Sequence, residues 1–161
     1  MAIYAVSKHI EKFINSLKLE GKIMSQTFAM VKPDCFAKRK KIINLISKNG
    51  FRIAAQMEHT FTKRQARNFY AVHKDRPFFN DLVEYMTSGP VLLLVLVKEN
   101  AVSDFRDLLG KTNPAEAADG TIRKMFGKSL DQNGSHGSDS DENAKIESRF
   151  FFPKFRMLAA S

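Results

Sequence analysis

The chain has 161 residues and a formal charge of +9, from 26 Lys and Arg against 17 Asp and Glu. With 43 % apolar residues it has enough material for one globular domain but too little for two of ordinary size. The longest apolar run, residues 91–97, is too short for a bilayer-spanning helix, which needs about 20 residues. A single cysteine, Cys35, excludes an internal disulfide or a cysteine zinc cluster, so we expect a reducing, cytoplasmic setting.

The charge is unevenly distributed. Residues 1–64 carry 13 basic and 4 acidic side chains, whereas residues 65–161 carry 13 of each. A basic front on an otherwise neutral domain keeps one class of function open, a binding module that docks nucleic acid or a protein partner through its N-terminal part.

Residues 1–24 are predicted to be a separate N-terminal extension. Apolar side chains recur there at helical spacing, which favours an amphipathic helix. They are Ile3, Val6, Ile10, Phe13, Ile14 and Leu17. Acidic residues and the lack of Arg argue against a transit peptide. Two interpretations remain open: translation starts at Met24, or the segment is a plain surface helix.

From residue 25 to 161, strand and helix signals alternate without an internal repeat. Strands are predicted over residues 27–31, 51–61 and 91–97, the last buried on both faces. Helices are predicted before Gly50, from the Thr62–Gln65 capping box through His73, over 77–86, from Asn100 to Gly110, over 122–126, and from Ser140 through Phe150. Residues 131–141 are predicted to form a loop. This order indicates one layered α/β or α+β domain.

The densest polar motif is the run Asn-Gly-Ser-His-Gly-Ser-Asp-Ser at residues 133–140. The flanking glycines leave room for a bulky reactant beside His136, and imidazole offers an unprotonated nitrogen as base or nucleophile. Glu147 follows eleven residues later in a predicted helix, where folding could bring its carboxylate back to the ring. By itself, a histidine in such a loop also fits a solvated residue.

A second group of residues is suited to phosphate. Lys32 ends the first predicted strand, Arg106 and Arg123 lie in helices, and Thr112 lies in a loop. Each arginine alone also fits a surface ion pair. Neither a P-loop nor a Gly-x-Gly-x-x-Gly sequence is present, so side chains would have to hold any nucleotide. In the segment Asp-Arg-Pro-Phe-Phe at 75–79, one aromatic is expected in the core and the other exposed for base stacking.

Together these segments resemble the nucleoside diphosphate kinases over roughly residues 26–155. The matching segments are Thr-Phe-Ala-Met-Val-Lys-Pro-Asp (27–34), His-Lys-Asp-Arg-Pro-Phe-Phe (73–79), Met-Thr-Ser-Gly-Pro-Val (86–91), Thr-Asn-Pro (112–114), Gly-Thr-Ile-Arg (120–123) and Asn-x-x-His-Gly-Ser-Asp-Ser (133–140). The resemblance implies a ferredoxin-like βαββαβ fold of the α+β class, with a four-stranded antiparallel sheet covered by helices.

The resemblance also implies a ping-pong mechanism. The Nδ1 atom of His136 would attack the γ-phosphate of a nucleoside triphosphate, typically ATP, and the phosphohistidine would pass the group to a nucleoside diphosphate. The matches of Glu147 and Ser138 imply that they orient the ring, and Tyr70 matches a tyrosine near the transferred phosphate.

The remaining matches imply how the nucleotide is held. Ribose and phosphate positions are matched by Lys32, Asn133, Arg106, Thr112 and Arg123, with His73 as an additional contact. Phe78 and Leu130 match the residues on either side of the base, and stacking tolerates every base. Mg²⁺ would bridge the nucleotide phosphates, with Asp139 reaching it through water.

The family assembles into hexamers or tetramers, and Pro114 falls in its subunit-contact loop. One segment departs from the family. The chain after Asp34 is about two residues shorter and lacks the usual glycine, which puts the local loop in question but not the chemistry. A histidine phosphatase is disfavoured, because Ser135 precedes His136 in place of the arginine of that class.

Overall fold

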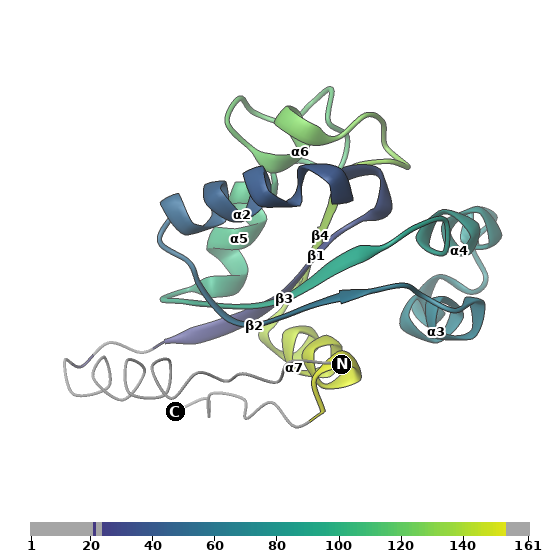
Figure 1. Cartoon of the computed structure of the whole chain (residues 1–161), viewed down its shortest axis with the longest axis horizontal. Helices are drawn as coiled ribbons and strands as arrows, with labels where there is room; N and C mark the ends of the chain where they lie inside the picture. The colour runs from purple at the N-terminus through teal and green to yellow at the C-terminus, as the bar shows by residue number, and fades with distance from the viewer. Residues whose placement is uncertain (1–20, 22–23, 154–161) are drawn as a thin grey trace.

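The computed structural model of the chain describes residue 21 and residues 24–153 (Figure 1). The predicted amphipathic helix in residues 1–24 lies outside the described residues, apart from Gly21 and Met24. The elements in chain order are β1 (Ser25–Val31), η1 (Pro33–Lys38), α2 (Arg39–Lys48), β2 (Arg52–His59), α3 (Lys63–Phe69), η2 (Ala71–His73), α4 (Phe79–Met86), β3 (Val91–Lys98), α5 (Ala101–Leu109), α6 (Ile122–Phe126), β4 (Ser135–Gly137) and α7 (Asp141–Phe151).

Four strands form one antiparallel sheet in the order β2-β3-β1-β4. This is the predicted ferredoxin-like α+β arrangement, with the first and third strands at the centre. Both central strands are buried almost throughout, because each of their faces is covered by helices, and β3 is apolar from Val91 to Val97.

The pleat of β1 divides its side chains between two cores. Phe28 and Met30 face a core completed by α3, α4 and α7, whereas Ala29 and Val31 face a core completed by α2, α5 and α6. In Figure 1, α2, α5 and α6 lie above the sheet and α7 lies below it, while α3 and α4 lie beyond the right-hand ends of β2 and β3. The site residues that follow β1 and lie on β4 are therefore held between two packed layers.

Several predicted boundaries are confirmed. Thr62 and Gln65 form the predicted capping box, with both reciprocal bonds present at the start of α3. The Ser140 hydroxyl accepts a hydrogen bond from the Asn143 N–H at the start of α7. Gly50 and Gly110 both have positive φ angles, +83° and +80°, as residues that follow a helix and reverse the chain often do.

Other boundaries were predicted wrongly. The helix from Thr62 ends at Phe69 and not at His73, because the backbone tightens at Tyr70 into the 3₁₀ turn η2 while the Tyr70 ring enters the core. The helix predicted to begin at Pro77 begins at Phe79.

The predicted cap at Asn100 is also wrong, because this residue has φ +54° and its side chain makes no cap hydrogen bond. Instead the hydroxyl of Ser25, from the start of β1, accepts a bond of 2.7 Å from the N–H of Ala101. A residue distant in sequence therefore satisfies one of the free donors at the start of α5.

The loop predicted over residues 131–141 contains the strand β4. Ser135, His136 and Gly137 pair with Val31, Met30 and Ala29 of β1. Gly137 is needed there, because a Cβ at this position would lie 2.7 Å from Phe105 Cδ1 and 2.8 Å from Leu109 Cδ1. A run of Gly, Ser and His has no strand periodicity, so this strand forms only because β1 supplies an edge to pair with.

The segment after Asp34 runs as η1 straight into α2, without an intervening loop. Cys35 is fully buried there, with its sulfur 3.1 Å from the carbonyl oxygen of Phe126. This contact of Cys35 packs η1 against α6.

Candidate active site

His136 lies on β4 with its ring partly buried between aromatic side chains. The ring centroid is 6.1 Å from that of Phe28 and 5.7 Å from that of Phe69. Its Nε2 atom is 3.0 Å from Oε1 of Glu147 on α7, and the two side chains are 23 % and 20 % exposed. Folding therefore brings together the histidine and carboxylate that the sequence separates by eleven residues.

The Glu147 carboxylate is itself fixed. The Ser138 hydroxyl donates a short hydrogen bond to Oε2, and Ser138 is fully buried, with its N–H 3.1 Å from the Phe28 carbonyl oxygen. A carboxylate only accepts hydrogen bonds, so in the neutral form of the imidazole this contact places the proton on Nε2. The Nδ1 atom is then left unprotonated and can act as a nucleophile.

Lys32 is a buried cation at the end of β1, with 8 % of its surface exposed. Its ammonium donates to Oδ1 of Asn133 at 2.9 Å, and the Asn133 amide donates to the Leu130 carbonyl at 3.2 Å. Burial, and then the positive charge of Arg123, lower the pKa of Lys32 to about 8. Because its nearest hydrogen-bond partner is neutral, an anion at this position would gain strongly from the lysine charge.

Arg123 on α6 is aimed by two backbone carbonyls. It donates to the oxygens of Gly110 at 3.0 Å and Ser135 at 3.2 Å, while its Nε atom is buried with no partner in the described part of the chain. Burial and the neighbouring Arg106 cation lower its pKa. Within residue 21 and residues 24–153, neither arginine nor Lys32 forms an ion pair within 4.0 Å.

A row of rings leads from the core to the surface on the α3–α4 side of the site. The Tyr70 and His73 centroids are 6.5 Å apart, and those of His73 and Phe78 are 5.7 Å apart. The Tyr70 hydroxyl is buried without a partner among the described residues, and burial followed by the Glu147 charge raises its pKa. Phe79 is buried and Phe78 is 46 % exposed, which confirms that one aromatic of this pair is in the core and the other is exposed; that Phe78 stacks on a base stays a prediction.

Two predicted residues lie in exposed loops. Leu130 is 56 % exposed, and Thr112 is exposed between α5 and α6. Within the described residues, the side chains of Leu130 and Thr112 form no hydrogen bond or ion pair like those of Glu147 or Lys32. Their predicted contacts are therefore with a bound nucleotide and stay predictions.

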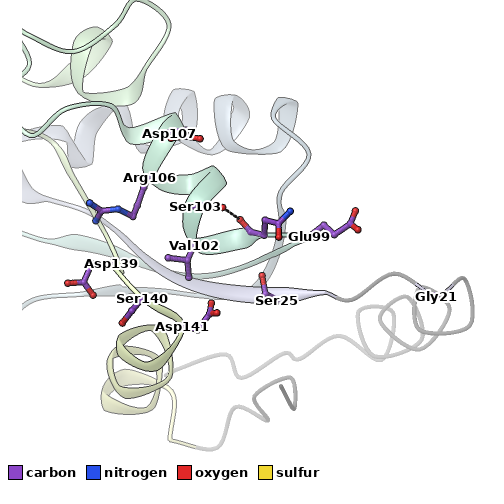
Figure 2. Close-up of a pocket in the computed structure, with 11 residues that line it drawn as sticks. Gly21, Ser25, Glu99, Val102, Ser103, Arg106, Asp107, Asp139, Ser140 and Asp141 are labelled. Carbon is purple, nitrogen blue, oxygen red and sulfur yellow. Dashed lines mark hydrogen bonds between the residues drawn. The ribbon is translucent and has the colours of Figure 1, made fainter. Parts of the chain in front are cut away.

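Arg106 and Asp139 line a pocket between α5 and the start of α7, which does not include His136 (Figure 2). Figure 2 shows both side chains at the same end of this pocket. A hydrogen bond of 2.6 Å from the Asn143 amide, with a smaller contribution from the Arg106 charge, lowers the pKa of Asp139. Asp139 is thus an exposed, ionised carboxylate close to the Arg106 guanidinium.

A histidine whose ring is fixed by a carboxylate, together with buried cations that form no ion pair within the described residues, is an arrangement suited to phosphoryl transfer. The comparisons with known proteins agree. A family model described as nucleoside diphosphate kinase matches residues 25–157.

The match to individual relatives extends over nearly the whole length of each relative. A nucleoside diphosphate kinase of Lawsonia intracellularis is 51 % identical over 137 residues, which are 84 % of this chain and 99 % of that protein. One of Campylobacter jejuni is 56 % identical over 131 residues, 80 % of this chain and 96 % of that protein. The crystal structure of the Aquifex aeolicus nucleoside diphosphate kinase superposes with a TM-score of 0.78 at 41 % identity, covering 81 % of this chain and 96 % of that one.

The chain therefore belongs to the nucleoside diphosphate kinase family, and it is an enzyme of the kinase and transferase class that binds nucleotides. These matches lend no support to the alternative of a binding module that docks through a basic front. No helix in the described part of the chain is long and apolar enough to cross a membrane.

Proposed function

We propose that this chain catalyses ping-pong transfer of the γ-phosphate from a nucleoside triphosphate, typically ATP, to a nucleoside diphosphate through a phosphohistidine on His136. One observation carries the proposal. His136 Nε2 is 3.0 Å from the Glu147 carboxylate, which leaves Nδ1 as the nucleophile, and the same site contains the buried cations Lys32 and Arg123.

In the first half-reaction the lone pair of Nδ1 attacks the γ-phosphorus. The bond from that phosphorus to the bridging oxygen breaks, and the diphosphate leaves with the electron pair. The ring becomes cationic as the Nδ1–P bond forms, and the charge of Glu147, held by Ser138, offsets that change. The second half-reaction reverses these steps, with a terminal oxygen of the acceptor diphosphate attacking the phosphohistidine.

The nucleotide is proposed to lie along the row of rings and cations. The base would stack between Phe78 and Leu130, which suits any base because every base has a π-face. The ribose and phosphates would be held by Lys32, Asn133, Arg106, Thr112, Arg123 and His73, with Tyr70 near the transferred group. Burial of Lys32 and Arg123 supports this placement, because desolvated cations bind phosphate more strongly than exposed ones.

Mg²⁺ is the proposed cofactor, held by the nucleotide phosphates. The described residues contain no group of three or more His, Cys, Asp or Glu side chains that could hold a metal ion, whereas Mg²⁺ commonly binds through phosphates, waters and one or two carboxylates. Asp139 is the carboxylate we place near it, through water. Bound Mg²⁺ would neutralise charge that develops on the phosphates.

We further propose that the enzyme is cytoplasmic and forms a hexamer or tetramer of identical chains, with the loop around Pro114 in a subunit contact. Sedimentation velocity would test the assembly. A monomer at micromolar concentration would refute it.

The activity is tested by mixing the protein with γ-labelled ATP and Mg²⁺, quenching in alkali, and measuring the label on the protein. We expect an acid-labile adduct of one phosphoryl group per chain that added diphosphate removes. The variant His136→Ala should stay unlabelled, while His59→Gln, at a histidine on β2, should label normally. Labelling and turnover of His136→Ala would disprove the assignment.

A further inference from the structure

Asp34 and Tyr85 meet beside Lys32, although none of the roles described above uses them. Asp34 lies two residues after Lys32 in η1, and Tyr85 lies near the end of α4. The Tyr85 hydroxyl donates a short hydrogen bond to Oδ1 of Asp34. The Lys32 ammonium is 6.0 Å from the centroid of the Tyr85 ring, at the outer limit of a cation–π contact.

The charged state of Lys32 depends on a balance between the groups around it. Burial and Arg123 of α6 lower its pKa, whereas Asp34 and, more weakly, Cys35 of η1 raise it, and the net pKa is about 8. With a pKa of about 8, about nine-tenths of the lysine is protonated at pH 7. Any loss of the favourable Asp34 charge would therefore discharge the lysine near neutral pH.

The Asp34 carboxylate is in turn held in place. Tyr85 donates to one oxygen, and the Cys35 sulfur lies 3.7 Å from the other. Burial, and then the bond to Asp34, raise the pKa of Tyr85, so its hydroxyl keeps the proton that it donates. The tyrosine thus joins α4, which supports the row of rings, to the segment that carries the lysine.

We propose that Asp34 and Tyr85 are positioning residues: the Asp34 carboxylate keeps Lys32 charged for a nucleotide phosphate, and the Tyr85 hydroxyl holds that carboxylate in place. The inference rests on the proposed role of Lys32 in phosphate binding. Neither residue is assigned a contact with the substrate.

The test is the pH dependence of kcat/KM for Asp34→Asn, expressed as a ratio to the unsubstituted enzyme from pH 6 to 9. Titration of the nucleotide phosphates and of other site groups is common to both proteins and cancels in the ratio. A fall in the Lys32 pKa to about 7 would leave the ratio near one at pH 6 and lower it about fivefold at pH 8. Asp34→Glu, which keeps the charge, should restore most of the alkaline activity.

Asp81→Asn is the matched control, because Asp81 is an exposed acid on the same helix as Tyr85. It should leave the ratio flat over the whole pH range. Tyr85→Phe keeps the ring and removes the donor, so we expect a smaller loss in the same pH range and no further loss when it is added to Asp34→Asn. A purely structural role would instead lower the ratio equally at every pH.

The same pH series is repeated for ADP binding by calorimetry, which requires no catalysis. If the unsubstituted protein lacks transfer activity, the proposed function fails, and ADP binding still decides the role of the pair. If both ratios for Asp34→Asn are independent of pH, or if Asp81→Asn shows the same profile, the positioning role is overturned. Thermal unfolding checks that each variant is folded. If Asp34→Asn does not fold, the pH series is measured with Tyr85→Phe instead.

Discussion

The contact between His136 and Glu147 predicts how much catalysis depends on one negative charge. The substitution Glu147→Gln keeps the size of the side chain but replaces the carboxylate that lies 3.0 Å from Nε2. Both side chains are mostly buried, at 23 % and 20 % exposure, so water cannot fully replace the lost partner. A hydrogen bond to a charged group contributes about 1.5–3 kcal/mol, which corresponds to a roughly ten- to hundredfold slower phosphorylation of His136.

The assay is a single-turnover measurement of phosphohistidine formation with excess ATP and Mg²⁺ in a rapid-quench instrument. Saturating ATP separates the rate of transfer from binding, and the loss should appear in that rate. Glu142→Gln is the control, because Glu142 is an exposed acid in the first turn of the same helix. A Glu147→Gln rate within twofold of the unsubstituted enzyme would refute the reasoning that the carboxylate stabilises the cationic ring.

Three further predictions follow from the packing and the charges. Gly137→Ala should lower the free energy of unfolding by about 1–3 kcal/mol, because its Cβ would overlap Phe105 and Leu109; urea denaturation measures this, and a change below about 0.5 kcal/mol would contradict it. The pKa of Lys32 falls from the ordinary 10.5 to about 8 on folding, so the unfolded chain binds more protons between these pH values and stability should rise with pH there. Relative to Lys32→Met, the unsubstituted protein should gain up to about 3 kcal/mol in free energy of unfolding between pH 8 and 10.5, as measured by urea titrations. If the difference in unfolding free energy between the two proteins stays the same over this pH range, the lysine is not buried as a charged group. Phe78→Ala should raise KM about tenfold, and by similar factors for ATP, GTP and CTP, because a stacked base contributes about 1–3 kcal/mol whatever its identity. A rise in KM for only one of these nucleotides would argue against base stacking on Phe78.

Sequence reasoning performed best where one local pattern implies one structure. Seven consecutive apolar residues predicted β3 as a strand buried on both faces, and the capping box marked the start of α3. It performed worst where a residue's hydrogen-bond partner is distant in the sequence. The Asn100 cap was predicted from residue type, but the donor at the start of α5 is satisfied by Ser25, 76 residues earlier.

The site shows the same division. The motif around His136 and the match to a family identified the residues to examine, yet the motif reads as a loop and the structure places it on a strand. The sequence contains no signal for the Tyr85 bond to Asp34, which joins residues 51 positions apart. Asp34 belongs to a quoted motif, but nothing local distinguishes its carboxylate from a solvated one.

The sequence by itself determined the order of strands and helices, the family and the residue types available for phosphoryl transfer. These follow from local periodicity, from turn chemistry and from a specific motif. Tertiary structure alone decided that the Glu147 carboxylate bonds to Nε2 and leaves Nδ1 free, and that Lys32 is a buried cation with a pKa near 8. Both depend on burial and on distances across the sheet, which arise only when segments remote in the chain pack together.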